Sequence, residues 1–130
     1  ATDLDSDCLA KAKAGEYDME ELGQLPRDYL SCFERKNNSC IGRVKQSIKD
    51  LVQFNRLNLL GPWPITVSFD VVFCRNVVIY FNKETQMELF DRIADVMTPH
   101  GYLFIGHSET LHGITTRFKS LGRTIYQKVE

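Results

Sequence analysis

The residues best suited to chemistry are Cys74, Arg75 and Asn76, which directly follow the run Phe69-Asp70-Val71-Val72-Phe73. A short run rich in β-branched and aromatic residues is typical of a strand buried on both faces, as in a parallel sheet covered by helices. Open α/β sheets bind their ligands at the carboxyl ends of such strands. We therefore expect Cys74 and Arg75 to line a pocket; a core strand followed by a buried turn is the alternative.

The elements around these residues can be predicted from the hydrophobic pattern. The segment 77–81 is too apolar for an exposed loop, so we expect it to stay packed. Asn82 is a predicted N-cap for a helix that ends at 98–101, and Tyr102–Ile105 is predicted to be the neighbouring buried strand. The apolar face of this helix comprises Met87, Leu89, Phe90, Ile93, Ala94 and Met97.

The sequences FDVVFCRNVVIYFNKETQ (69–86) and PHGYLFIGHSETL (99–111) resemble the CheR family of chemotaxis receptor glutamate methyltransferases, which use S-adenosylmethionine. The resemblance runs from Ala1 to Tyr126. It implies an α/β fold with a Rossmann-like class I methyltransferase sheet, mostly parallel, and a small antiparallel β insertion at residues 22–52. The segments 117–120 and 124–129 predict an antiparallel closing hairpin, which suits a methyltransferase better than a hydride-transferring oxidoreductase.

The resemblance also implies the role of six site residues, each with a plainer alternative. Asp3 would hold the ribose, because a carboxylate can accept from both hydroxyls; otherwise it is a capping or solvated acid. Adenine needs polar partners at its edge and apolar contact on its face, which Asn58 and Leu59 would supply. On pattern alone, Asn58 is a turn residue and Leu59 a core residue. Tyr80 would be catalytic or, alternatively, a packed tyrosine. The implied set is Asp3 for the ribose, Asn58 and Leu59 for adenine, Cys74 and Arg75 near the methionine portion, and Tyr80 at the reacting end.

The start of the chain looks like the tail of a strand followed by a helix. Asp5 or Ser6 is a suitable N-cap, Gly15 a suitable stop, and Cys8, Leu9 and Ala12 form a modest apolar face. The glycines contain no G-x-G-x-x-G or phosphate-loop spacing. By the resemblance, the glycine-bearing cofactor loop, the central strand and the N-terminal helical domain would precede Ala1. We therefore expect residues 1–130 to be a partial methyltransferase domain, inactive by itself.

The region from 22 to 52 interrupts the α/β rhythm. We expect a short helix over 25–33, a polar turn over 34–39 and a strand over 50–54, with alternating Ile41, Val44 and Ile48 between them. In some family members a glycine-bearing loop here grips a receptor tail peptide. The matching turn, Glu34–Asn38, has no glycine, which predicts recognition without such a peptide. Arg43, Lys45 and Lys49 are either solvated or a receptor-binding patch.

Composition excludes several other classes of protein. A net charge of -1, from 16 basic and 17 acidic residues, gives no general attraction to nucleic acid. No apolar run reaches the roughly 18 residues that span a bilayer, so a cytoplasmic protein without membrane insertion is expected. The four cysteines form no C-x-x-C pair, which predicts reduced thiols and no metal site. His107-Ser108-Glu109 is not a hydrolase triad, because adjacent residues do not generally aim at each other, and we interpret it as structural.

The resemblance implies methyl transfer from S-adenosylmethionine to glutamate side chains in the cytoplasmic domain of a membrane chemoreceptor. The products would be a methyl ester and S-adenosylhomocysteine. A non-catalytic methyltransferase-like module that binds a receptor or regulator is the alternative. Cofactor binding by a longer chain would distinguish the two.

Overall fold

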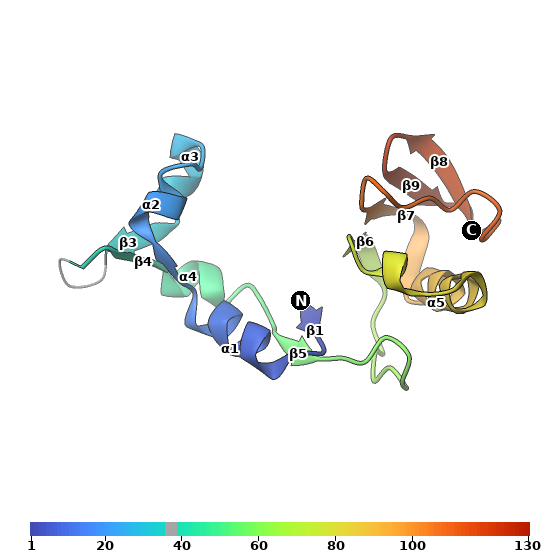
Figure 1. Cartoon of the computed structure of the whole chain (residues 1–130), viewed down its shortest axis with the longest axis horizontal. Helices are drawn as coiled ribbons and strands as arrows, with labels where there is room; N and C mark the ends of the chain where they lie inside the picture. Colours follow the sequence, from blue (N-terminus) through green and yellow to red (C-terminus); the bar gives the residue numbers. More distant parts are fainter. Residues whose placement is uncertain (36–38) are drawn as a thin grey trace. The chain divides into compact units, whose positions relative to one another are not determined.

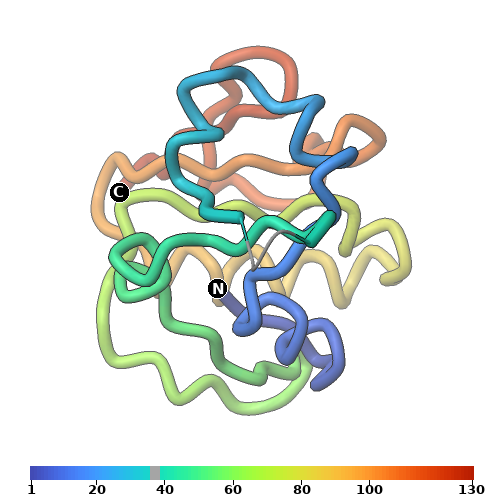
Figure 2. Tube along the Cα trace, turned by 90° about the vertical axis from the view of Figure 1, so that its left-hand side faces the viewer, coloured from blue at the N-terminus to red at the C-terminus, as the bar shows by residue number. Residues whose placement is uncertain are grey.

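The computed structural model describes residues 1–35 and 39–130, which form two compact units, Ala1–Trp63 and Pro64–Glu130 (Figures 1 and 2). Each unit is described by itself. Helices combine with parallel and antiparallel strand pairs, as expected for an α/β protein. Across the described residues, no helix has the length and apolar character needed to cross a membrane.

The first unit contains a short parallel pair and a helix. Strand β1 (Thr2–Asp3) pairs with β5 (Asn55–Arg56), and α1 (Ser6–Ala14) follows β1. Asp5 is the N-cap of α1, because its carboxylate accepts from the Asp7 amide at 2.8 Å. Gly15, at φ 63°, ends the helix in the left-handed conformation that glycine adopts without strain. These caps confirm the predicted helix, although only Leu9 of its expected apolar face is buried.

A three-stranded antiparallel sheet also lies in this unit, in the order β2-β4-β3. The central strand carries buried Gly42, where an added Cβ would lie 3.1 Å from Met19 Sδ and closer still to the Leu22 side chain. The missing side chain therefore lets α2 pack against the sheet. The elements are β2 (Glu16–Asp18), α2 (Met19–Leu22), α3 (Arg27–Leu30), β3 (Phe33–Arg35) and β4 (Ile41–Val44).

The predicted strand at 50–54 is wrong. Helix α4 (Gln46–Lys49) occupies the preceding residues, and backbone bonds from Leu51 to Ile48 and from Val52 to Lys49 extend its turns. Gln46 also donates to Asp50 at 2.7 Å, an i,i+4 contact that favours helical geometry. Strand β5 starts only at Asn55, and Ile48 belongs to α4 rather than to the alternating strand.

Two other expectations for this region differ from the structure. The helix expected over 25–33 is shorter, because Phe33 pairs with Val44 in the sheet and strand pairing overrides local helix propensity. The turn expected over 34–39 starts too early, because Glu34 and Arg35 belong to β3, and residues 36–38 lie outside the described residues.

The second unit is built on a four-stranded sheet in the order β6-β7-β9-β8. Strands β6 (Phe69–Cys74) and β7 (Met97–Ile105) are parallel, whereas β9 (Ile125–Lys128) is antiparallel to β7 and to β8 (Phe118–Gly122). The predicted closing hairpin is thus formed by β8 and β9 (Figure 1). Strand β7 begins earlier than Tyr102, and Pro99 lies within an irregularity in its pairing with β6.

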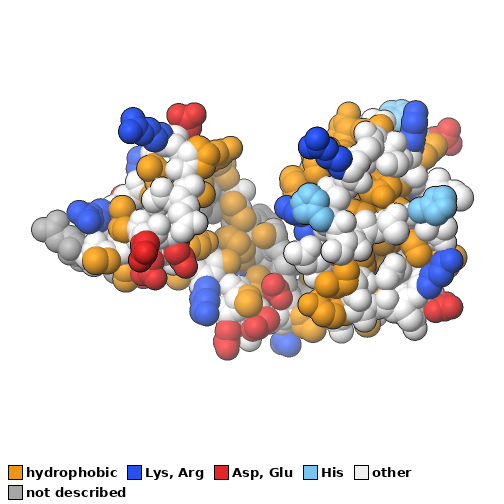
Figure 3. Space-filling model, turned by 45° about the horizontal axis from the view of Figure 1, so that its top comes forward, with side chains coloured by type: hydrophobic (Ala, Val, Ile, Leu, Met, Phe, Trp, Pro, Cys, Tyr) orange, Lys and Arg blue, Asp and Glu red, His pale blue; other side chains and the backbone are white. Residues whose placement is uncertain are grey.

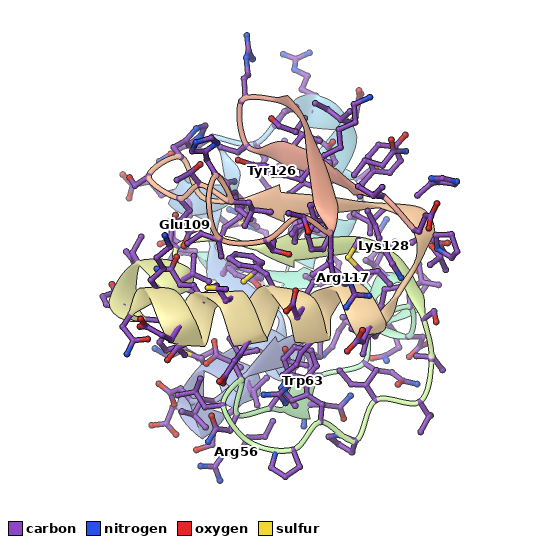
Figure 4. The ribbon with its side chains drawn as sticks, turned by 90° about the vertical axis from the view of Figure 1, so that its right-hand side faces the viewer. Arg56, Trp63, Glu109, Arg117, Tyr126 and Lys128 are labelled. Atoms are coloured by element: carbon purple, nitrogen blue, oxygen red, sulfur yellow. The ribbon has the colours of Figure 1, made fainter. Side chains whose placement is uncertain are left out.

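Helix α5 (Lys83–Asp95) lies against one face of this sheet and forms the core with it (Figure 4). Asn82 caps the helix as predicted, accepting from the Thr85 amide at 2.9 Å. The expected end of the helix at 98–101 is wrong, because α5 ends at Asp95 and Met97 is the first residue of β7. Phe90 from the helix and Leu103 and Ile105 from β7 are completely buried. The other helix residues in the core are Leu89, Ile93 and Ala94.

The opposite face of β6 is exposed, contrary to the expectation of burial on both faces. Phe69, Val71 and Phe73 alternate along the strand and are 38%, 43% and 70% exposed. Phe73 stacks on Phe104 of the adjacent strand, with ring centroids 4.7 Å apart. Hydrophobic side chains consequently reach the surface of the molecule, as Figure 3 shows.

Substituting Phe90→Ala should destabilise the second unit by about 3–5 kcal/mol, since it leaves a cavity between α5 and the sheet. Native-state hydrogen exchange at the amides of Leu103 and Ile105 would report this loss without assuming that the whole chain unfolds in one step. Glu88→Ala, at an exposed position of the same helix, is the control and should change stability by about 0.5 kcal/mol or less. Equal protection in the two variants would contradict the assigned core.

Candidate functional site

Two chain segments meet where the parallel strands β6 and β7 end. Cys74 and Ile105 are register partners in the last pair of the ladder, so the residues that follow each strand leave the sheet at the same edge. After β6 the chain turns at Asn76, which has a φ of 59°, and enters the 3-10 helix η1 (Val78–Tyr80). After β7 it passes through Gly106 to Glu109.

Glu109 joins these two segments through its carboxylate (Figure 4). Oε1 accepts from the amides of Val77 at 2.9 Å and Val78 at 3.0 Å. Oε2 accepts from the amide of Asn76 at 3.2 Å and also from that of Gly106. The residue is 8% exposed, and four charge-assisted hydrogen bonds compensate for removing its charge from water. We call this arrangement the Glu109 clamp.

Gln86 binds backbone carbonyls of the same segment. Its amide nitrogen, projecting from the first turns of α5, donates to the carbonyls of Val78 at 3.0 Å and Phe81 at 2.9 Å. Within η1, the Phe81 amide donates to the Val78 carbonyl at 3.0 Å. The backbone on both sides of Tyr80 is therefore fixed by hydrogen bonds.

Gly106 is required by the close approach of the two segments. A Cβ at this position would lie 2.7 Å from Glu109 Oε2 and 3.0 Å from the Asn76 nitrogen, so no side chain fits without displacing the clamp. Beyond Glu109, the Leu111 amide donates to the Tyr126 hydroxyl at 3.4 Å. This bond ties the loop to strand β9.

Tyr80 is placed differently from the sequence-based expectation. Val78 is 2% exposed and its neighbours Val77 and Phe81 are half-buried, but Ile79 is 49% and Tyr80 81% exposed, so the expected packing does not extend to Tyr80. The Tyr80 ring projects from the surface of the second unit instead of being held by apolar neighbours. Its orientation depends on the hydrogen-bonded backbone of η1.

Cys74 and Arg75 differ sharply in environment. Arg75 is exposed, whereas Cys74 is buried at the end of β6. Burial, with a smaller effect from the negative charge of Glu109, raises the pKa of the Cys74 thiol to about 11. The Cys74 thiol is accordingly neutral at neutral pH.

In the first unit, Asp3 also follows the carboxyl-end rule. It is the last residue of β1, it is exposed, and its Oδ1 accepts from the Asp5 amide at 3.0 Å. Oδ2 has no hydrogen-bond partner within the part of the chain that the structure describes. Asp3 is therefore not the helix cap, which is Asp5, and its carboxylate can accept further hydrogen bonds.

Asn58 and Leu59 lie just beyond the carboxyl end of β5, the parallel partner of β1. Asn58 is exposed and starts a turn in which its Oδ1 accepts from the Leu60 amide at 3.0 Å. Leu59 is half-buried, and its carbonyl accepts from the Trp63 indole at 3.2 Å. The first unit thus brings Asp3 and the turn with Asn58 and Leu59 to the ends of two paired strands.

Two of the three basic residues expected to be either solvated or a receptor-binding patch have structural partners. Arg43 forms an ion pair with Glu16 on the neighbouring strand at 2.6 Å. Lys49 donates to the carbonyl of Ala14, at the end of α1, at 3.1 Å. These contacts assign both side chains a role within the first unit.

Sequence reasoning missed the Glu109 clamp and the role of Gln86. The Glu109 carboxylate faces backbone amides, which is a structural contact, whereas His107 and Ser108 are exposed and their part in the structural interpretation stays a prediction. The only available signal was a glutamate two residues before the buried Leu111, in a loop that follows a buried strand. Over the described residues, no group of three or more His, Cys, Asp and Glu side chains is placed to hold a metal ion, and all four cysteines are free thiols.

The raised pKa of Cys74 predicts low reactivity. At pH 8 a thiol with a pKa of about 11 is only about 0.1% thiolate, so iodoacetamide should modify Cys74 at least about 100-fold more slowly than exposed Cys40. The Cys74 rate should rise as the pH approaches 11. Peptide mass spectrometry after timed alkylation measures both rates, and unfolded protein, in which the two should react alike, is the control. Comparable native rates at pH 8 would refute the assignment.

The sequence of the chain is similar to those of known proteins. Residues 1–127 match the family model described as CheR methyltransferase, SAM binding domain. The chain is 39% identical to a probable chemotaxis protein methyltransferase of Rhizobium etli, over 98% of this chain and 49% of the relative. It is 40% identical to the chemotaxis protein methyltransferase of Escherichia coli, over 97% and 46%. The chain spans about half the length of these relatives. It belongs to the CheR methyltransferase family, within whose SAM-binding domain it falls.

Proposed function

We propose that the protein containing this chain transfers the methyl group of S-adenosylmethionine to glutamate side chains of a chemoreceptor. The observation that carries the proposal is the family match over residues 1–127. The relatives' names, chemotaxis protein methyltransferase, supply the reaction class. The partner would be the cytoplasmic domain of a membrane receptor, which puts the protein in the cytoplasm.

The finer architecture is part of the same proposal. The parallel pairs β1–β5 and β6–β7 and the β8–β9 hairpin are those that a class I methyltransferase sheet requires. Residues 22–52, with most of the three-stranded antiparallel sheet, would be the family's inserted subdomain. Residues 1–130 would then form part of a methyltransferase domain.

The residues of the first unit fit the nucleoside portion of the cofactor. Asp3 offers an exposed carboxylate with an oxygen available to the ribose hydroxyls. Asn58 is exposed and offers its amide to the adenine edge, and half-buried Leu59 offers an apolar surface to the ring.

The residues of the second unit fit the methionine portion and the reacting end. Cys74 and Arg75 end β6, where α/β sheets bind ligands. A neutral Cys74 thiol suits this place, because a thiolate would itself compete for an electrophilic methyl group. Tyr80, exposed on a fixed backbone, can offer its hydroxyl to an incoming carboxylate and its ring face to a cation.

The proposed chemistry needs no general base. A glutamate carboxylate is ionised at neutral pH, so no proton has to be removed from it. The cofactor supplies a methyl group on a sulfonium and leaves as S-adenosylhomocysteine, while the receptor gains a methyl ester. The task of Tyr80 is to hold the carboxylate oxygen in line with the reacting carbon.

Two substitutions test the assigned roles as a matched pair. In the full-length protein, Tyr80→Phe should lower turnover about 10-fold or more and leave cofactor affinity nearly unchanged, because the hydroxyl acts on the substrate side. Asp3→Ala should instead weaken cofactor binding by about 1.5–3 kcal/mol, the range for hydrogen bonds to a charged group. Labelled-methyl incorporation into receptor and calorimetry of cofactor binding measure the two effects.

Each outcome separates the proposal from its alternative. A Tyr80→Phe variant with the wild-type rate at saturating cofactor and receptor would remove the hydroxyl from the mechanism. A wild-type protein that binds receptor but neither binds the cofactor nor transfers methyl would be a non-catalytic interaction module.

A last proposal concerns the receptor. Because the turn Glu34–Asn38 has no glycine, the protein should recognise the receptor near its methylated glutamates rather than through a tail peptide. Fluorescence anisotropy with labelled receptor tail peptides should show no saturable binding, with a scrambled peptide as control. Sequence-specific binding of a tail peptide would contradict this expectation.

A further inference from the structure

We propose that Glu109 is a positioning residue for methyl transfer, which it supports by fixing the backbone that presents Tyr80. The inference rests on the proposed function, because Tyr80 is the substrate-side residue of that reaction. Glu109 itself is buried beneath the loop and bonded to backbone amides, so it touches neither substrate nor cofactor. Its effect would pass through the geometry of η1.

The exposure of Tyr80 makes the backbone decisive. With 81% of the residue exposed, neighbouring side chains do little to orient the ring. The direction of its Cα–Cβ bond is set by η1, whose first residue, Val78, is itself a partner of Glu109. Three consecutive amides, 76–78, point at one carboxylate, and this leaves little freedom for the turn that enters η1.

A carboxylate is the group that this arrangement requires. All four partners are N–H donors, and an ionised carboxylate offers two oxygens that only accept. In Glu109→Gln, one of these atoms becomes an NH₂ group, so two backbone donors lose their acceptor although the side chain keeps its size. Glu109→Asp keeps the charge but is one methylene too short to reach all four amides.

The loss should remain local. Gln86 holds the carbonyls of Val78 and Phe81 independently of Glu109, and the buried side chains of Phe90 and Leu103 take no part in the clamp's hydrogen bonds. We therefore expect Glu109→Gln to fold with a displaced entry to η1. Cys74 and Arg75 stay at the end of β6, so the cofactor side should change little.

A double-mutant cycle in the full-length protein tests this role. Glu109→Gln should lower kcat about 10-fold in the wild-type background but less than about threefold in the Tyr80→Phe background. The reason is that displacing the Tyr80 hydroxyl costs nothing further once that hydroxyl has been removed. The cofactor dissociation constant should stay within about twofold. Glu88→Gln, at an exposed position of α5, removes a charge in the same way and should leave kcat unchanged.

Equal losses of kcat in the two backgrounds, or a loss accounted for by cofactor binding, would overturn the positioning role. If Glu109→Gln does not fold, as judged by circular dichroism and cofactor binding, Glu109→Asp enters the same cycle, with the same coupling expected and additivity again decisive against it. A wild-type protein without methyl transfer would overturn the proposed function together with this inference. An active wild type with additive mutations would overturn the inference alone.

Discussion

The second unit depends on a buried carboxylate that is compensated by backbone amides. Burying an ionised glutamate is costly unless hydrogen bonds replace its water, and Glu109 gains four of them. The condition for this is set by the sheet: β6 and β7 must run parallel, so that both chain segments leave the same edge. Gly106 must lack a side chain, and Tyr126 of the closing hairpin must hold the loop that carries the carboxylate. The edge of the parallel sheet, the loop after β7 and the closing hairpin therefore all support one contact.

The Glu109 clamp fixes the backbone at η1 while the Tyr80 side chain stays exposed. Side chains are usually fixed by packing, but a residue that meets a protein substrate has to stay accessible. At η1, Val78 packs into the core and the backbone is bonded on its amide side by Glu109 and on its carbonyl side by Gln86. Tyr80 can then be exposed on a well-defined support. If apolar contacts alone ordered this loop, the Tyr80 ring would have to be buried in order to be fixed.

Local sequence signals predicted the elements whose structure is decided locally. The caps at Asp5 and Asn82 are correct because a side-chain acceptor beside free amides favours a helix start in any fold. A strand is expected at 50–54 because Leu51, Val52 and Phe54 are apolar or β-forming. It does not form, because backbone bonds and the Gln46–Asp50 contact continue the turns of α4 into this segment. Phe33 illustrates the opposite case, where strand pairing replaces the predicted helix. The carboxyl-end rule pointed to Cys74, which does end a strand of the sheet, whereas the roles expected for Asp3 and Asn58 came from the family resemblance. It could not find the clamp, because the partners of Glu109 are amides, which every residue carries.

Glu109 and Cys74 show why burial alone does not determine charge. Both are buried at the same end of the sheet, yet four amides solvate the carboxylate, whereas burial without such donors raises the pKa of the thiol to about 11. The negative charge of Glu109 adds to that rise, so the group that orders the loop also disfavours a thiolate beside it. In the proposed reaction, a neutral thiol would not be alkylated by the electrophilic methyl group and would not compete with the receptor carboxylate for it. Under the proposed function, the clamp would link two requirements of methyl transfer, a fixed Tyr80 and an unreactive Cys74, to one carboxylate.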